Sequence, residues 1–329
     1  MKTQSKLSLL RCCALAAIMA TAGTATSALA ETFPTRAIRI VVNTGPGGLV
    51  DVTTRLVAEK MQENLGQPVV VENRAGGDGL VGILAAKEAG ADGYTLLATA
   101  ATIAIQPAVK KNPGYDLVND FAGVGPIMRS PYLVVEGAGE PDKTLGDFIA
   151  RAKADPKKMS YASAGVGTGT HLAAALFLKQ AGVDILHIPY KGNGPAMPDV
   201  MAGRVNMIFE AYNSGASKLK DGTLKALAVT STERLSSLPD VPTIAEAGLE
   251  DYSYYVYTGL VAPEGTPKEV IDRLSSALQS ALSDEAVKAR FKEGGGETMS
   301  MTPADFDQYL KDDLVRMNTL VEDLGIPKK

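Results

Sequence analysis

Residues Ile38–Asp51 read IRIVVNTGPGGLVD and join a strand to a helix through a glycine turn. The β-branched run Ile38–Val42 predicts a buried strand. The residues after the glycines predict a helix with one apolar stripe, formed by Leu49, Val52, Leu56, Met61 and Leu65. The first amides of a helix have no internal partner and carry partial positive charge. The turn is therefore either an anion site, with Asp51 capping amides or orienting a partner, or a βα turn without a ligand.

The same arrangement occurs again more than a hundred residues later. Ser160–Leu178 reads SYASAGVGTGTHLAAALFL, which predicts a short strand, a glycine turn and an apolar helix. Two such turns on opposite sides of a cleft would hold a small anion at both ends. This pair of turns is the central hypothesis about the site.

The first thirty residues have the pattern of an export signal. Lys2, Lys6 and Arg11 precede the apolar stretch Cys12–Gly23, and Ala28-Leu29-Ala30 is an A-x-A cleavage site. We therefore expect a signal peptide at 1–30 and a soluble, exported mature chain. Both cysteines lie in that peptide, so we expect no disulfide, thiol nucleophile or cysteine metal site. Removing three basic residues changes the formal net charge from −4 to −7, which argues against nucleic acid as a partner.

Strand and helix patterns alternate through most of the mature chain, which predicts an α/β fold of mostly parallel sheets flanked by helices. The aromatic-rich stretch Tyr252–Leu260 predicts a strand that returns to the first half, and Thr99–Thr102 predicts a turn. If two lobes exist, we expect the chain to cross between them near Met128–Pro131 and Glu250–Tyr252. Lobe 1 would then be 31–130 with 251–329, and lobe 2 would be 131–250.

Several motifs do not support catalysis. Gly77-x-Gly79-x-x-Gly82 fits the dinucleotide fingerprint, but no acidic ribose partner follows, so a glycine-rich turn is the better interpretation. Nothing in the sequence pairs His171 or His187 with an activated serine. His187, between apolar strand residues, is expected to be structural. His171, directly behind the second glycine turn, either supports that turn or contacts the ligand. We expect no catalytic residues, no metal site and no cofactor.

The chain resembles the Bug-type receptors of tripartite tricarboxylate transporters over nearly all of the mature sequence. Beyond the first turn, the matching segments are GQPVVVENRAGGDGLVG (Gly66–Gly82), DGYTLL (Asp92–Leu97), YASAGVGTGTHLAA (Tyr161–Ala174), HIPYKGNGPAMPDVMAG (His187–Gly203), LAVTSTERLSSLPDVPTIAEAGL (Leu227–Leu249) and GLVAPEGTP (Gly259–Pro267).

This resemblance implies a two-lobe periplasmic-binding-protein fold and a receptor that is not an enzyme. Such a receptor closes on a small carboxylate and delivers it to a membrane permease. The turns would hold the ligand through amides, hydroxyls and waters. The expected ligand-binding residues are Asn43, Thr44, Gly47, Gly48, Asp51, Thr99, Ala164, Gly165, Gly167, Thr168, Thr170, His171, Tyr190 and Glu210.

Two departures from the family pattern affect this expectation. Asn43-Thr44 stands where the family commonly has Pro-Phe, so the ligand cannot be inherited from better-known members. Tyrosines such as Tyr252 stand where tryptophans are frequent. Glu210 either faces the cleft or caps the following helix, and Lys191 is expected to be a solvated loop lysine.

The expected function is capture of a di- or tricarboxylate, an amino acid or an aromatic acid by a monomer that serves a tripartite tricarboxylate transporter permease. The alternative is an exported α/β hydrolase whose nucleophile the sequence does not identify.

Overall fold

The structure is a computed structural model that describes residues 33–328. The chain divides into two units, Met1–Thr35 and Arg36–Lys329, and every element named below lies in the second. The predicted signal peptide at 1–30 is outside the described residues. No helix in the described part of the chain is long and apolar enough to cross a membrane.

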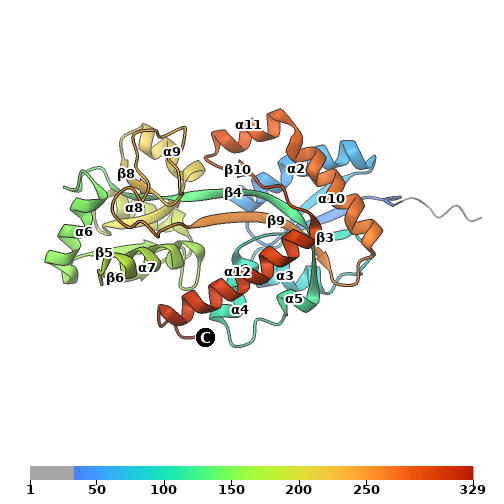
Figure 1. Ribbon diagram of the computed structural model, residues 1–329, viewed down its shortest axis with the longest axis horizontal. Helices are drawn as coiled ribbons and strands as arrows, with labels where there is room; N and C mark the ends of the chain where they lie inside the picture. The colour runs from blue at the N-terminus through green and yellow to red at the C-terminus, as the bar shows by residue number, and fades with distance from the viewer. Residues whose placement is uncertain (1–32, 329) are drawn as a thin grey trace, which may run out of the picture. The chain divides into compact units, whose positions relative to one another are not determined.

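Ten strands form the sheets (Figure 1). Their bounds are β1 Ile38–Val42, β2 Val69–Asn73, β3 Thr95–Ala100, β4 Phe121–Gly137, β5 Ser160–Ser163, β6 Leu186–Pro189, β7 Met207–Ala211, β8 Leu224–Val229, β9 Tyr255–Pro263 and β10 Glu297–Thr298.

The α-helices are α2 Leu49–Leu65, α3 Leu80–Lys87, α4 Thr102–Val109, α5 Leu117–Asp120, α6 Leu145–Ala154, α7 Gly169–Ala181, α8 Asn193–Met201, α9 Tyr212–Lys220, α10 Lys268–Ser283, α11 Glu285–Glu293 and α12 Pro303–Asp323. Short 3-10 helices lie at Gly77–Gly79 and Pro156–Lys158.

The strands are hydrogen-bonded in the order β2-β1-β3-β9-β4-β7-β5-β6, and β8 and β10 also pair with β4. The first part of β4, up to Pro131, pairs with β9, and from Tyr132 onward it pairs with β7. β4 therefore belongs to two sheets. We call β2, β1, β3, β9 and the first part of β4 the first sheet. The second sheet contains the rest of β4 with β7, β8, β5 and β6.

Strand directions decide which ends of the two sheets face each other. β1 is parallel to β3, which is antiparallel to β9, which is antiparallel to β4. β1 therefore runs in the direction of β4, toward the second sheet. β5 is parallel to β7, which is antiparallel to β4, so β5 runs back toward the first sheet. The carboxyl ends of β1 and β5, where the two glycine turns begin, lie on the facing edges of the two sheets.

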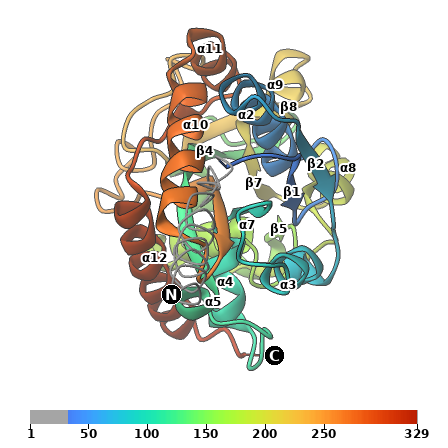
Figure 2. The ribbon, with the colours of Figure 1, turned by 90° about the vertical axis from the view of Figure 1, so that its right-hand side faces the viewer.

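Long C-terminal helices cover the first sheet (Figure 2). α10 packs on α2, and α12 packs on α4 and on β4. Three tyrosines, Tyr252, Tyr254 and Tyr257, are among the largest fully buried side chains. The hydroxyl of Tyr257 donates to Asp313 Oδ2 on α12 at 2.9 Å, and that of Tyr252 donates to the carbonyl of Ala173 on α7 at 2.9 Å. Tyr257 thus ties β9 to α12, and Tyr252 ties the segment before β9 to α7.

Three sequence predictions about the elements were wrong in detail. The buried face of α2 contains Thr53 and Thr54, whereas Val52 is 46% exposed. Thr53 Oγ1 donates to Leu49 O at 2.8 Å, so a buried hydroxyl is satisfied within the helix. The predicted turn at Thr99–Thr102 is the end of β3 and the start of α4, a helix with Pro107 inside it. The returning strand begins at Tyr255 and not at Tyr252.

Candidate ligand-binding site

The first glycine turn leaves the start of α2 open. Gly48 is the N-cap with an extended backbone (φ −78°), and no side chain caps the helix. The amides of Leu49 and Val50 have no acceptor within residues 33–328, as expected for the first turn of a helix. Gly47 has φ +80°, which favours glycine. The turn therefore presents backbone donors to any anion that reaches it.

Asp51 braces the first turn from behind. Its Oδ2 accepts from the Gly47 amide at 2.9 Å, and its Oδ1 accepts from Arg55 Nε at 2.9 Å and Asn73 Nδ2 at 2.8 Å. Burial opposes the charge, but the hydrogen bonds from Arg55, Gly47 and Asn73 prevail and hold the pKa of Asp51 below its ordinary value. The carboxylate is therefore ionised, and both of its oxygens already accept hydrogen bonds from groups of the protein.

The second glycine turn is braced internally by hydroxyls. Thr168 Oγ1 donates to Gly165 O at 2.8 Å and accepts from the His171 amide at 3.4 Å. Thr170 Oγ1 accepts from the Ala164 amide at 3.0 Å. The amides of Gly169 and Thr170, at the start of α7, have no acceptor in the described part of the chain. These two amides correspond to the open donors of the first turn.

His171 and His187 hold the second turn in place. His171 Nδ1 accepts from the Gly167 amide at 3.1 Å, which fixes a glycine with φ +76°. The rings of His171 and His187 are stacked with their centroids 4.1 Å apart, and the His187 ring is stacked with that of Tyr161 at a centroid distance of 4.7 Å. Burial lowers the pKa of His187 to about 4. The neutral ring of His187 thus supports the turn, as its sequence position predicted.

The structure pairs a serine with His187, which the sequence could not show. Ser163 Oγ lies 2.7 Å from His187 Nε2. Ser163 is fully buried, accepts from the Gly165 amide at 3.1 Å and contacts Gly165 O at 3.2 Å. A nucleophilic serine must be reached by an acyl carbon. The pair therefore supports the turn and does not have the geometry of a hydrolase.

The remaining predicted residues lie on the same facing edges. Asn43 follows β1, and its Nδ2 donates to Thr99 Oγ1 at the end of β3 at 3.1 Å. Glu210 is the last residue but one of β7, and Tyr190 follows β6, which runs parallel to β5. In parallel sheets ligands bind outside the carboxyl ends of the strands, which is where these residues gather.

Glu210 and Tyr190 have partners within the protein. Glu210 accepts from Asn193 Nδ2 at 2.8 Å and from the Ser214 hydroxyl on α9. Burial raises the pKa of Glu210. The Tyr190 hydroxyl donates to Asp199 at 2.6 Å. Glu210 therefore binds the start of the following helix, one of its two predicted roles, and Lys191 is exposed as expected.

Sequence reasoning missed two residues of these edges. Asn193 follows Gly192, whose amide donates to Ala164 O in the second turn at 3.1 Å. The Tyr132 hydroxyl on β4 lies so near the start of α7 that a Cβ on Gly169 would be 2.8 Å from it. Asn193 belongs to the matched segment HIPYKGNG, so its position in a motif was the available signal. Nothing local marks Tyr132.

The two edges are in contact. A Cβ on Gly167 would lie 2.9 Å from Val109 Cγ1, at the end of α4. The second turn therefore rests against a helix that follows the first sheet. Gly167 and Val109, more than fifty positions apart, meet here because β3, which leads into α4, and β5, which leads into the second turn, run in opposite directions.

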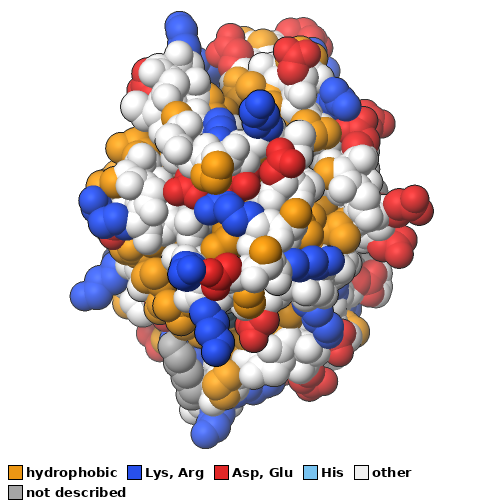
Figure 3. Space-filling view, turned by 90° about the vertical axis from the view of Figure 1, so that its left-hand side faces the viewer, with side chains coloured by type: hydrophobic (Ala, Val, Ile, Leu, Met, Phe, Trp, Pro, Cys, Tyr) orange, Lys and Arg blue, Asp and Glu red, His pale blue; other side chains and the backbone are white. Residues whose placement is uncertain are grey.

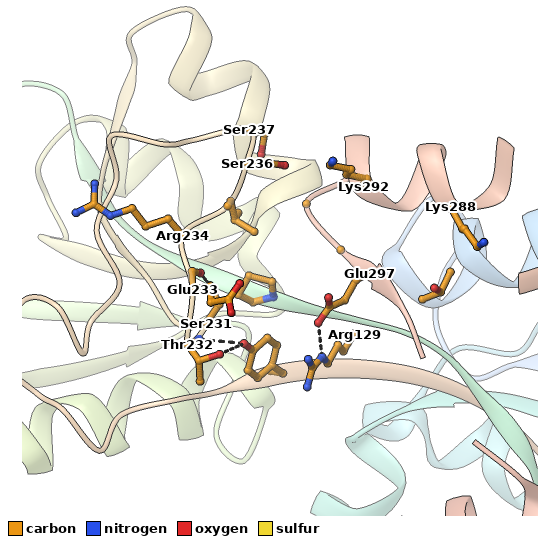
Figure 4. A pocket seen from close by; sticks show the side chains of 16 residues that line it. Arg129, Ser231, Thr232, Glu233, Arg234, Ser236, Ser237, Lys288, Lys292 and Glu297 are labelled. Carbon is orange, nitrogen blue, oxygen red and sulfur yellow. Dashed lines mark hydrogen bonds and ion pairs between the residues drawn. The ribbon is translucent and has the colours of Figure 1, made fainter. Parts of the chain in front are cut away.

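A cavity lies elsewhere, over the strands that join the sheets (Figure 4). It has a volume of about 490 Å³. Its lining comprises residues 231–237 after β8, Lys288 and Lys292 of α11, residues 295–298 at and just before β10, and Arg129, Pro131 and Tyr255. Arg129 pairs with Glu297, and the Thr232 amide donates to Tyr255 Oη at 2.9 Å. No predicted site residue lines this cavity.

A cluster of three carboxylates, Glu136, Glu140 and Asp142, has the spacing of a metal site, since one oxygen from each lies within 4.8 Å of the others. Two cations already occupy it. Arg151 contacts Glu140 at 2.7 Å and Asp142 at 2.5 Å, and Lys225 Nζ lies 3.0 Å from Glu136. Burial raises the pKa of Glu136 to about 8 despite Lys225. The cluster is an ion-pair network.

Comparison with known proteins gives concordant results. Residues 53–326 match the family model described as the tripartite tricarboxylate transporter family receptor. Protein BugT from Bordetella pertussis is 34% identical over 94% of this chain and 96% of its own.

Two solved structures are similar over the whole fold. Periplasmic binding protein BugD is 32% identical with a TM-score of 0.81, covering 90% of this chain and 100% of its own. Rpa4515 of R. palustris with adipate is 31% identical with a TM-score of 0.83, covering 90% of this chain and 99% of its own. The two-lobe periplasmic-binding-protein fold is thus confirmed, and the chain belongs to the Bug-type receptor family of tripartite tricarboxylate transporters.

Proposed function

We propose that the chain is a periplasmic receptor that captures a small carboxylate between its two lobes and delivers it to the permease of a tripartite tricarboxylate transporter. One observation carries the proposal: the helices α2 and α7 begin on facing strand edges, and their first amides have no acceptor within residues 33–328. The carboxylate bound by Rpa4515 supports the same ligand class.

The energy of such a site is adequate without a lysine or arginine cluster. A hydrogen bond to a charged group contributes about 1.5–3 kcal/mol, and a helix N-terminus adds about 0.3–1 kcal/mol. Four such contacts, less the cost of immobilising the ligand and closing the lobes, give roughly −8 kcal/mol, a micromolar dissociation constant. This affinity suits capture followed by release.

The proposed lobes are 31–130 with 251–329, and 131–250. The change of partner in β4 between Pro131 and Tyr132 supports a hinge there. The cavity of Figure 4 spans this hinge, so closure of the lobes changes its width. Solution scattering with and without a saturating carboxylate should show compaction. An unchanged radius of gyration at saturation contradicts a closing clamp.

The decisive test of function is a binding screen. Thermal shift and calorimetry of the purified chain 31–329 against mono-, di- and tricarboxylates, amino acids and aromatic acids should reveal saturable binding. A ligand at 100 times its dissociation constant adds about 2.7 kcal/mol of stability. The ligand should be recovered unchanged. Turnover of p-nitrophenyl esters by the purified chain would instead support the hydrolase.

We further propose cleavage after Ala30 and a monomeric, soluble receptor without a nucleic-acid partner, metal or cofactor. Acidic and basic side chains are interspersed on the face shown in Figure 3, unlike the basic stripe that a polyanion selects. Intact mass of periplasmic protein should give a chain beginning at Glu31, and light scattering should give one chain per particle. A mass that retains 1–30 contradicts the proposed export.

A further inference from the structure

Asn43 is a buried side chain whose amide oxygen lacks a partner. It is 1% exposed, and its Nδ2 donates to Thr99 Oγ1 at 3.1 Å. Thr99 Oγ1 itself donates to Ala100 O at 3.2 Å, so it must accept from Asn43, which fixes the amide orientation. No donor among residues 33–328 reaches Asn43 Oδ1. The oxygen therefore lacks a hydrogen bond directly beside the first glycine turn.

Asn193 repeats this situation on the other facing edge. Its Nδ2 donates to Phe209 O and to Glu210 Oε2, both at 2.8 Å, so the amide orientation is again fixed by acceptors. Its Oδ1 is buried, with no hydrogen-bond partner in the described chain. Asn193 adjoins the second turn through the bond from the Gly192 amide to Ala164 O.

A simple carboxylate cannot satisfy these oxygens. Carboxylates accept hydrogen bonds, and the amides at the starts of α2 and α7 supply donors for them. The two asparagine oxygens require donors, and a buried acceptor without a donor is unfavourable. The facing edges therefore combine donors for an anion with acceptors for a hydroxyl or ammonium group.

Resting on the receptor function above, we propose that this receptor selects carboxylates that carry a hydrogen-bond donor, a hydroxyl or ammonium group, and that Asn43 and Asn193 determine this selectivity. Glu210, held by Asn193, adds a carboxylate beside one of the two acceptors. An ammonium ligand gains from that charge, whereas a hydroxyl ligand does not. Adipate, the diacid in the structure of Rpa4515, carries no such hydrogen-bond donor.

Matched ligand series test the proposal on the wild-type chain. Calorimetry compares succinate, malate and aspartate, then glutarate, 2-hydroxyglutarate and glutamate, then propionate, lactate and alanine. Within at least one series the hydroxy or amino acid should bind about tenfold or more tightly than the unsubstituted acid. A greater affinity for the amino acid identifies ammonium, and a greater affinity for the hydroxy acid identifies hydroxyl.

Three variants assign the selectivity to the residues. Asn43→Leu and Asn193→Leu should each bring the affinity ratio within the series close to one. Asn206→Leu is the matched control. Asn206 directly precedes β7, away from the facing edges, and its side-chain amide bonds to the Ser160 amide and to Glu140. This variant should keep the ratio of the wild-type chain.

Three outcomes overturn the inference. Equal affinities within every series on the wild-type chain refute the selectivity. A ratio that survives in both Asn43→Leu and Asn193→Leu refutes its assignment to these residues. In both cases the carboxylate receptor stands. Failure of the wild-type chain to bind any carboxylate in the wider screen refutes the proposed function and this inference together. The ligand series on the wild-type chain needs no variant, so the proposed selectivity can be refuted even if a variant misfolds.

Discussion

The two glycine turns serve the same strand-to-helix geometry but are built differently. At the first turn, Gly48 leaves α2 without a side-chain cap, and one carboxylate, Asp51, braces Gly47 from behind. At the second turn, Thr168, Thr170 and His171 all bond to the turn itself. Both turns leave helix amides without an acceptor in residues 33–328, but the first has no bracing hydroxyl, whereas the second uses its hydroxyls for rigidity. Substitutions should affect binding at the first turn and folding at the second.

The largest expected effect is the difference between valine substitutions of Gly48 and Gly167 in stability and in ligand binding. Gly167→Val places a branched side chain at φ +76°, with its Cβ 2.9 Å from Val109 Cγ1. Left-handed strain of about 1–2 kcal/mol and overpacking of about 1–3 kcal/mol should together lower the unfolding free energy by roughly 2–5 kcal/mol. Gly48→Val meets only Gly45 O at 3.6 Å, with φ −78°, so it should fold normally and lose ligand binding.

Melting curves beside calorimetric titrations separate the two effects. Gly66→Ala is a useful control, because Gly66 has φ +68° and open space around its Cβ, so it reports backbone strain alone. Gly167→Ala should be clearly less stable than Gly66→Ala. Equal stabilities of those two variants, or full affinity in a folded Gly48→Val chain, contradict the contrast between the turns.

Acid should weaken the second turn before the first. The folded chain lowers the pKa of His187 from 6.5 to about 4 through burial, so the unfolded chain binds the proton more readily. This contribution to stability is complete above pH 6.5 and is lost as pH falls toward 4. At about 1.4 kcal/mol per pKa unit, the loss is about 3 kcal/mol at pH 4. Asp51, whose pKa is lowered, loses its contribution only below its ordinary value of 3.8.

Unfolding free energies measured from pH 7 to 4.5 test this difference. His187→Gln keeps a hydrogen-bonding side chain but does not titrate, so its stability should fall less steeply over the same range. The same slope in His187→Gln and in the wild-type chain assigns the acid sensitivity to other groups.

Local patterns in the sequence were sufficient to predict both turns. The β-branched run before Asn43 and the glycines after it predicted β1 and the start of α2, and Ser160–Leu178 did the same for β5 and α7. Hydrophobic periodicity failed at Thr53, because it cannot count a buried hydroxyl that bonds within its own helix. The start of α4 was also missed, because the small residues Thr99–Thr102 indicated a turn.

Long-range pairing was beyond the reach of the sequence. The hydrogen bond from the Gly167 amide to His171 depends on the orientation of the His171 ring, which stacks with His187 on β6 and, through it, with Tyr161 on β5. Asn193 lies near the second turn because β6 runs parallel to β5, which brings the neighbouring Gly192 into hydrogen-bond contact with Ala164. Whether a site residue stabilises a turn or is free to contact the ligand depends on these hydrogen-bond and stacking partners, and its position in the sequence does not reveal them.

The smallest expected effect concerns two threonines. Thr168→Val removes a helix cap and the bond to Gly165 O, so it should cost about 0.5–2 kcal/mol of stability and change ligand affinity little. Thr44 Oγ1 is buried without a partner in residues 33–328, so Thr44→Val should leave stability nearly unchanged. If the ligand uses that hydroxyl, affinity should fall about tenfold or more. Calorimetry and melting curves of both variants test the assignment, because a stability loss in Thr44→Val with unchanged affinity would mean that the first turn uses its hydroxyl as a brace, as the second turn does.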